Sequence, residues 1–596
     1  MALIVLAGAQ VAAAQTVTIL PLQPSNSFLA PIRPFVGGTL GQASSAQPTH
    51  PSVDDDRNGS TFVSMDSWVY PTLERLAALG LIPSQDISIR PWTRQECRRQ
   101  LRETEDILYG FGDLDTPVND AIRNEAERLV PDLERELQEP NGKTTATLES
   151  MYVRGGTIAG APLTDGFHFG QTWWNDYGRP LGRGTSAITG YSLRLTSGRW
   201  FFHVRQEMQS DPGVRAITPA QANLFNQLDN VPFSSAPTIP PAIVPQPAPA
   251  VAAYVRQRPL DLYAGYAFAG YAVSFGKQEI YWGPTTMGPW AFSSNAEPTY
   301  NLRLMSTRPH PFPLVPQLGS YRVDLVFGKL SGHKYPARPY YNGQKISLIF
   351  GSYFETSFTR WSVLWGVGHP MSLHTLKNNL FSSDSTGATF AYGDRTDPGD
   401  RKGDWDFRLH VPGLKEYATI YGDAYSDDEV NPIDAPRRVA WQTGLYMPHL
   451  PKAPHVDFRF EMASSEELSQ DEGGARFFLN NQYRDSNTNK GFLLGNGVGR
   501  DGRAFEGRIG YWVSPRTRIE AGYRQNKISE RFLPTGGTVS DGFITGDFAW
   551  NKEWSAQVFT QYERFLIPSF MPGRHDNTSA RIQITWTPQK NVELIR

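Results

Sequence analysis

The sequence has very little cysteine and no long hydrophobic run. Its only cysteine is Cys97, which excludes an intramolecular disulfide and makes cysteine chemistry unexpected. After the N-terminus no uninterrupted apolar stretch reaches about 20 residues, and the mean hydropathy is -0.42, so membrane-spanning helices are excluded. A transmembrane barrel is not excluded, because its apolar side chains alternate with polar ones along each strand.

The chain also lacks a strong charge of either sign. Its 57 basic and 59 acidic residues give a net charge of -2, which provides no argument for nucleic acid or an anionic membrane surface as a partner. Glycine and proline, in contrast, are abundant, with 54 and 46 residues, and 12% of the residues are aromatic. This composition is typical of many short strands joined by turns, so we expect an all-β protein that binds no nucleic acid.

The N-terminal residues have the pattern of an export signal. A short apolar run ends in Ala12-Ala13-Ala14 before Gln15, like the apolar region and small-residue cleavage site of a signal peptide. We therefore predict a signal peptide over residues 1–14, and because the usual basic residues before the apolar run are missing, we expect the true start to lie upstream. Residues 15–65 are rich in Pro, Ser, Gln and Gly without periodicity, which predicts a linker.

Residues 66–140 change to helical spacing. Leu73 and Leu76 recur on one face, and Thr93 with Glu96 forms a capping box that opens a further helix. We predict a periplasmic helical domain with helices over residues 70–79, 93–109 and 116–139, the last bent at its proline, Pro131.

From about residue 145 to 590 the sequence consists of alternating segments separated by turn residues. Short and long separators take turns: Ser197-Gly198 joins one pair of segments, whereas residues 210–253 separate the next. The segments number about eighteen, and an even number is expected for a single-chain outer-membrane barrel. Because short turns are typical of the periplasmic rim, we expect the helices and the C-terminus to be periplasmic and the long loops to face outward.

The two faces of these segments differ in charge. In residues 404–411, Trp405 and Phe407 alternate with Asp406 and Arg408. Aromatic residues at segment ends suit a lipid interface, and charges of both signs suit a lumen packed with paired groups. A soluble sandwich would also alternate, but its Greek-key connections give no reason for alternating turn lengths. The side chains expected to line the lumen are those of Arg194, Arg205, Arg322, Asp324, Asp406, Arg408, Asp457, Arg459, Glu506, Arg508 and Arg581.

The stretch over residues 271–304 combines a predicted strand with a long, outward-facing aromatic loop. Aromatic rings stack on the C–H faces of sugars, and amides satisfy sugar hydroxyls, so this loop is a candidate sugar platform. The alternative is a loop packed into the barrel mouth, and the two interpretations are compatible. The candidate polysaccharide-binding residues are Tyr281, Trp282, Trp290, Asn295 and Glu297.

The same loop resembles a known family. Trp282-Gly283-Pro284 followed by Ser-Asn-Ala-Glu-Pro at residues 294–298 is similar to the central signature of the capsule-assembly Wzi family. Residues 70–96 resemble the helical opening of that family, and residues 343–366 and 404–429 resemble its later strands, so the likeness covers about residues 66–590.

This resemblance implies an eighteen-stranded outer-membrane barrel with a helical bundle at its periplasmic mouth. It also implies a lectin that attaches capsular polysaccharide to the cell surface. The chain departs from the family in two places: residues 210–253 look like an insertion, and Glu297 stands where the family usually has a basic residue. The ligand chemistry that the family has at this position therefore does not carry over to Glu297.

Three classes of function remain open. The first is a non-enzymatic barrel that binds and anchors capsular or extracellular polysaccharide, surrounded by outer-membrane lipid and lipopolysaccharide, with the polysaccharide export machinery as a further candidate partner. The second is a solute porin with a periplasmic helical domain. This domain could tether the barrel to the cell wall, since the segment from Tyr70 also resembles an S-layer-homology segment. The third and weakest is a polysaccharide-modifying enzyme.

Catalytic and metal-binding patterns are scarce. The carboxylates Asp427, Asp428 and Glu429 are more often a solvated strand end than an acid/base pair, and a glycosidase needs two carboxylates at a fixed separation that sequence does not reveal. His369 and His374 have no Cys or His cluster to complete a metal site. There is no nucleophile elbow and no phosphate loop. We therefore expect no enzyme activity, no metal and no cofactor.

Overall fold

A computed structural model describes most of the chain after the expected linker. The described residues are 58–110, 119–139, 144–229, 250–382, 393–414, 416–427, 439–467, 473–588 and 591–595. The predicted signal peptide lies outside them, as do most of the linker and the predicted start of the third helix at residue 116. Asp428 and Glu429 also lie outside them.

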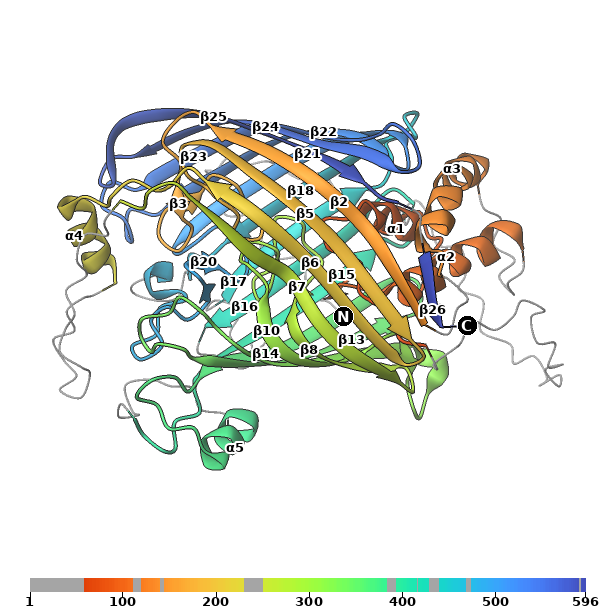
Figure 1. Ribbon diagram of the computed structural model, residues 1–596, viewed down its shortest axis with the longest axis horizontal. Helices are drawn as coiled ribbons and strands as arrows, with labels where there is room; N and C mark the ends of the chain where they lie inside the picture. Colours follow the sequence, from red (N-terminus) through yellow and green to blue (C-terminus); the bar gives the residue numbers. More distant parts are fainter. Residues whose placement is uncertain are drawn as a thin grey trace, which may run out of the picture. The chain divides into compact units, whose positions relative to one another are not determined.

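Within the described residues, eighteen long antiparallel strands close into a barrel, as the alternating segments predicted (Figure 1). The barrel closes where the first strand pairs with both its successor and the last long strand, so every wall strand has a neighbour on each side. The long strands are β2 (Thr144–Ile158), β5 (Gly184–Ser197), β6 (Trp200–Asp211), β7 (Tyr254–Phe268), β8 (Tyr271–Gln278), β10 (Thr299–Ser306), β12 (Ser320–Lys329), β13 (Tyr340–Phe350), β14 (Phe354–Leu364), β15 (Asp400–His410), β16 (Thr419–Asp427), β17 (Val439–Met447), β18 (Val456–Ser464), β21 (Gly502–Ser514), β22 (Thr517–Ile528), β23 (Gly537–Ala549), β24 (Trp554–Ile567) and β25 (Met571–Trp586).

Shorter elements complete the sheet and its connections. These short elements are β1 (Ile89–Arg90), β3 (Thr164–Asp165), β4 (Gly170–Gln171), β9 (Tyr281–Trp282), β11 (His310–Pro311), β19 (Thr488–Asn489), β20 (Phe492–Leu493), β26 (Asn591–Ile595) and the 3-10 helices η1 (Pro316–Leu318) and η2 (Gly473–Arg476). Two of the short strands, β11 and β26, extend the barrel pairing, and the other six form three two-stranded sheets, β1-β9, β3-β4 and β19-β20.

The wall is polar inside and apolar outside, the reverse of a soluble sandwich core. Along β12, Arg322 and Asp324 are fully buried, whereas Leu325 is 41% exposed. The alternation with period two places these two sets of side chains on opposite faces of the strand. A wall of this kind suits lipid around it and a packed polar interior.

The connections alternate in length, and this sorts them between the two ends of the barrel. β5 and β6 are joined by a tight turn, whereas the β6–β7 connection contains α4 (Pro219–Leu228) and the β14–β15 connection contains α5 (Leu373–Phe381). Figure 1 shows α4 and α5 at the end opposite the N-terminal helices. The short-turn end and the long-loop end are therefore distinct surfaces.

Three helices precede the wall at its short-turn end: α1 (Val69–Ala78), α2 (Arg94–Tyr109) and α3 (Asp120–Leu137). The Thr93 hydroxyl accepts a hydrogen bond from the Glu96 N–H, as predicted for the start of α2. The Glu96 carboxylate binds Arg99. None of the described helices is long and apolar enough to cross a membrane.

The helices share a core with the barrel. Leu73, Leu76, Leu101 and Leu133 are buried together, and Trp512 of β21 packs into the same cluster. The apolar faces of α1, α2 and α3 are thus covered by one another and by an inward side chain of the wall.

Candidate functional site

The Trp282 loop, residues 279–298, turns into the barrel. Its Tyr281–Trp282 segment, β9, pairs with β1 of the N-terminal segment, the described residues 58–110 and 119–139. The Arg90 guanidinium donates a 2.6 Å hydrogen bond to the Gly283 carbonyl. The expectation that this loop faces outward is therefore wrong. It bridges the interior, because its backbone groups find partners in the N-terminal segment there.

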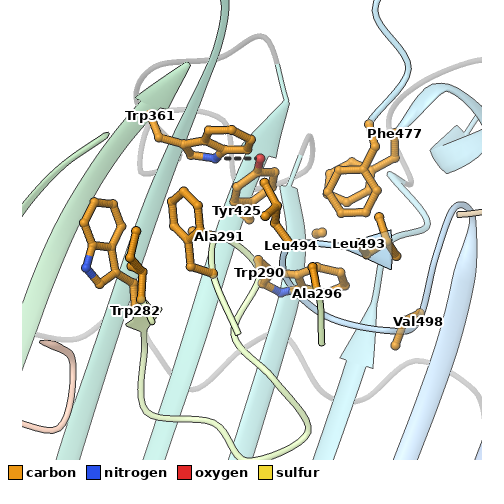
Figure 2. Close-up of a cluster of buried hydrophobic side chains, with 14 of the residues drawn as sticks. Trp282, Trp290, Ala291, Ala296, Trp361, Tyr425, Phe477, Leu493, Leu494 and Val498 are labelled. Carbon is orange, nitrogen blue, oxygen red and sulfur yellow. Dashed lines mark hydrogen bonds between the residues drawn. The ribbon is translucent and has the colours of Figure 1, made fainter. Parts of the chain in front are cut away.

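The loop is buried against a second loop, the Phe477 loop, residues 473–501. Trp290 lies 5.8 Å from Phe477, measured between ring centroids, and the Trp361 indole donates a 2.8 Å hydrogen bond to the Tyr425 hydroxyl. Figure 2 shows these side chains pointing toward one another from the two loops and the wall. Trp282 and Trp290 are both fully buried, so neither offers a ring face to a sugar, and the packing interpretation describes them.

Asn295 and Glu297 also bind protein groups. The Asn295 side chain accepts a hydrogen bond from Gln171 at 3.0 Å and donates one to the Leu493 carbonyl at 3.1 Å. Its amide is therefore satisfied without a sugar hydroxyl. The polysaccharide-binding role assigned to Tyr281, Trp282, Trp290, Asn295 and Glu297 stays a prediction, and the burial of all five removes its geometrical basis.

Glu297 holds three cations together. Its carboxylate lies 2.7 Å from Arg258 and 2.8 Å from Lys490, and it also binds Lys277. Burial raises the pKa of Glu297, but these cations lower it to about 2. The chain thus places a buried carboxylate among basic residues, which gives a physical reason for an acidic residue at this position.

The N-terminal segment also contacts the inner face of the wall. Asp86 accepts hydrogen bonds from the Ser347 hydroxyl at 3.0 Å and from Arg322 at 3.3 Å. Gln85 accepts from Arg408 at 2.7 Å through its side chain and at 2.8 Å through its backbone carbonyl. These wall charges therefore find partners in the segment between α1 and α2.

The predicted lumen residues contact groups inside the barrel. Six contact the N-terminal segment: Arg194 binds Glu139, Arg205 binds Asp66, Arg322 binds Asp86, Asp406 binds Ser88, Arg408 binds Gln85 and Arg459 binds Glu74. The other five contact the wall or the inward loops: Asp324 binds Arg303 and Trp282, Asp457 binds Arg518 and Trp512, Glu506 binds Arg508, and Arg581 binds Asp176.

Polar cavities remain between the N-terminal segment and the wall. One of about 300 Å³ is lined by Asp66, Arg94, Arg194 and Arg205. Two others, of about 200 and 230 Å³, share Asn175 in their lining. These spaces are large enough for water, so the interior is filled but not dry.

The Phe477 loop is the part of the site that sequence reasoning did not resolve into residues. Asn489 donates a 2.8 Å hydrogen bond to the Glu297 carbonyl, and the Tyr425 hydroxyl donates to Asn487 at 3.0 Å, so its underside is fastened to the interior. Its Asn481 and Lys490 are exposed. The partners of these residues are far away in the sequence, so no local pattern points to them.

No group of three or more metal-ligating side chains that could hold an ion occurs in the described residues. His369 lies 3.2 Å from Asp397 and stacks near Tyr483, with ring centroids 4.7 Å apart. His374 lies in the exposed part of α5. The two histidines are thus in different surroundings and do not form one site.

The chain matches a known protein family in sequence and a solved barrel in structure. The family model for capsule assembly protein Wzi matches residues 154–580. Among solved structures, Wzi of Escherichia coli, described as an outer-membrane protein involved in group 1 capsule assembly and a carbohydrate-binding β-barrel, is 14% identical. The match covers 90% of this chain and 100% of that chain, with a TM-score of 0.60.

Weaker likenesses connect the chain to other barrels. OccAB4 of Acinetobacter baumannii is 10% identical over 76% of this chain and 98% of its own, with a TM-score of 0.38. OprD of Pseudomonas aeruginosa is 8% identical over 76% and 96%, with a TM-score of 0.37. Comparison with curated protein sequences gives no match. Because the family model spans more than half of the chain, this protein belongs to the capsule assembly protein Wzi family, and its fold is that of an outer-membrane β-barrel.

Proposed function

We propose that this protein binds capsular or extracellular polysaccharide at the cell surface and anchors it there without catalysing a reaction. Family membership supports this function, and so does the carbohydrate binding ascribed to Wzi of Escherichia coli. The structural observation that carries it is the contact between β1 and β9, where the N-terminal segment meets the Trp282 loop across the interior. A barrel closed in this way is built to hold a ligand outside the lumen.

The filled interior argues against a general porin. A porin keeps its inward charges in water so that solutes pass, whereas here Arg322, Asp86 and Glu355 are buried and bonded to protein groups. A passing solute would have to displace these charge-assisted hydrogen bonds, which are stronger than neutral ones. The purified protein should therefore conduct little.

The proposal includes an orientation. Short turns and the N-terminal helices face the periplasm, and the long loops face outward. The polysaccharide then meets the long-loop end, where the Phe477 loop presents Asn481 and Lys490. This loop is anchored by the hydrogen bond from Asn489 to the Glu297 carbonyl, and Lys490 also pairs with the Glu297 carboxylate. Outer-membrane lipid and lipopolysaccharide surround the wall, and the export machinery delivers the polymer.

Retention of polysaccharide by whole cells tests this assignment. A strain lacking the gene should shed its polysaccharide, and the wild-type gene should restore retention. If each polar contact contributes ~1 kcal/mol, the double variant Asn481→Ala, Lys490→Gln should weaken binding by roughly thirtyfold. Lys552→Gln is the matched control, because Lys552 is exposed in a short turn at the other end. Full retention by the normally folded double variant, together with a conducting wild-type barrel, would favour the porin.

A further inference from the structure

Helix α5 turns polar side chains toward the protein and large apolar side chains away from it, the opposite of most helices packed on a protein. Its inward stripe is polar: the Trp365 indole donates a 2.8 Å hydrogen bond to the Thr375 hydroxyl, and the Asn379 amide donates one of 2.7 Å to the Ser362 hydroxyl. Thr375 and Asn379 are buried. The helix therefore lies on the wall through hydrogen bonds, where a soluble protein would use apolar side chains.

The outward stripe of α5 contains large apolar residues and one basic residue. Leu373 and Phe381 are 86% and 79% exposed, and Met371 just before the helix is 60% exposed. Lys377 stands between them at the same four-residue spacing and is also exposed. Large apolar residues gathered on the outer side of one short helix are typical of a helix that lies in a membrane interface.

Contacts at the C-terminal end hold α5 in this orientation. The Arg360 guanidinium of β14 donates hydrogen bonds to the carbonyls of Asn379 at 2.7 Å, Leu380 at 2.8 Å and Ser382 at 3.0 Å. These carbonyls are among those that a helix end leaves without partners. Because Arg360 satisfies them, the backbone at this end of the helix has its hydrogen-bond partners within the protein.

The helix continues an aromatic cluster on the outside of the wall. Phe327, Tyr340 and Trp365 lie 5.6 to 5.9 Å apart, measured between ring centroids, at the long-loop ends of β12, β13 and β14. Aromatic residues in this position mark the boundary between lipid tails and headgroups. Trp365 also binds α5 directly, and Figure 1 shows the helix beside the wall near β14.

Basic residues surround this apolar surface. Lys377 is on the helix, and Lys329 and Arg338 are exposed at the adjacent ends of the wall strands. The Lys329 ammonium lies 5.9 Å from the centre of the Tyr340 ring. Apolar side chains with basic residues close by are complementary to acyl chains that carry phosphate groups.

We propose that α5 is an interfacial helix that binds the acyl chains and phosphates of a phosphorylated outer-leaflet glycolipid. The proposal rests on the orientation given under the proposed function, with the long loops outward. It assigns Leu373 and Phe381 to the acyl chains and Lys377 to a phosphate. The helix thereby adds a fixed lipid contact beside the loops that are proposed to hold the polysaccharide.

Nitroxide accessibility tests the lipid contact in the full-length protein. Single substitutions Phe381→Cys, Ile346→Cys and Glu530→Cys are labelled, while native Cys97 stays unlabelled because it is fully buried. Ile346 is 40% exposed on the outer wall and reports lipid, and Glu530 is exposed in the β22–β23 loop and reports water. The protein is reconstituted in vesicles of phosphatidylethanolamine and lipid A, and relaxation by oxygen is compared with relaxation by a soluble nickel chelate.

The label at residue 381 should match the one at 346, with an oxygen-to-nickel ratio severalfold above that at 530. A ratio equal to that at 530 would overturn the inference, as would a label shielded from both reagents, which would indicate a second protein copy on α5. A label at 346 that is itself in water would show that the barrel is not inserted in the membrane. That result would overturn the proposed orientation, and the inference about α5 with it, and it is distinguishable from a failure at residue 381 alone.

The phosphate contact has its own test. The ratio at residue 381 should rise when lipid A replaces a neutral lipid, and Lys377→Gln should abolish this rise while Lys552→Gln leaves it unchanged. An unchanged rise in the Lys377→Gln variant would overturn the assignment of Lys377.

Discussion

The indole N–H of Trp282 donates a 2.7 Å hydrogen bond to the carboxylate of Asp324, and both side chains are fully buried. Asp324 is also paired with Arg303 at 2.6 Å. A loop tryptophan is thus joined to a charged pair on the inner wall of the barrel. Trp282 therefore fixes the inward course of its loop, and its contribution to stability can be measured.

Replacement of Trp282 by Ala should destabilise the barrel strongly. The change removes a buried aromatic ring and leaves Asp324 without one of its donors, and such losses typically cost about 3–5 kcal/mol. Trp200→Ala is the control, because Trp200 is 61% exposed beside a short turn. Thermal unfolding followed by heat-modifiable gel migration compares them. Equal midpoints for the two variants would contradict the structural role of Trp282.

Deletion of residues 58–139 should convert the closed barrel into a conducting one. Every strand of the wall pairs with other wall strands and needs no strand from this segment. The only strand pairing that the deletion removes among the described residues is the short one between β1 and β9. Arg322 and Arg408 would then face water in place of Asp86 and Gln85. Single-channel recording in planar bilayers should show a large steady conductance for the deletion and little for the full chain. A deletion variant that inserts but stays closed would show that the loops alone seal the lumen.

The long-loop end contains a histidine latch whose strength depends on pH. The Nδ1 of His168 lies 2.7 Å from Asp165, and its Nε2 lies 3.1 Å from Asp229, which also pairs with Arg500 at 2.5 Å. Phe225 of α4 stacks on the imidazole, with ring centroids 4.9 Å apart. Burial lowers the pKa of His168, but the two carboxylates raise it to about 9.

Because the pKa of folded His168 lies above its ordinary value of about 6.5, the latch contributes fully below about pH 6.5. Its contribution is lost as the pH rises through about 9, and amounts to roughly 3 kcal/mol at most. Proteolysis in the segment around α4 should accelerate between pH 7 and 9.5. The His168→Gln variant should be cleaved faster at pH 7 and lack this acceleration. A wild-type rate that does not change over this range would argue against the latch.

The orientation can be tested with epitope tags. A tag placed between Ser197 and Gly198 should be hidden on intact cells and become accessible when the outer membrane is permeabilised. A tag within residues 211–253 should be labelled from outside, because the β6–β7 connection lies at the long-loop end. The reverse pattern of labelling would invert the proposed topology.

The barrel could be predicted from sequence because its signal is local. The alternating segment over residues 404–411, for example, corresponds to β15 over Asp400–His410, since alternation and turn residues are visible within a few positions. Helix α4 was missed, although Thr218 and Gln221 form a capping box with a proline at the first turn. That signal lay inside a segment whose proline content favoured an irregular loop.

The course of the Trp282 loop could not be predicted in the same way. Aromatic residues between glycines and prolines look alike whether a loop faces water or the lumen. The deciding partners are distant: Asp324 lies 42 positions from Trp282, and the Leu494 carbonyl that binds Ser293 lies 201 positions away. The predicted lumen charges were easier to place because strand alternation fixes which side of the wall they occupy.

Equilibrium binding of the purified, full-length protein to the polysaccharide of its own host tests the central claim most directly. A closed barrel that anchors polymer through its long-loop end should bind saturably, leave the polymer length unchanged, and lose affinity when Asn481 and Lys490 are replaced together. A correctly folded protein that shows no binding to this polysaccharide at any concentration would contradict the account.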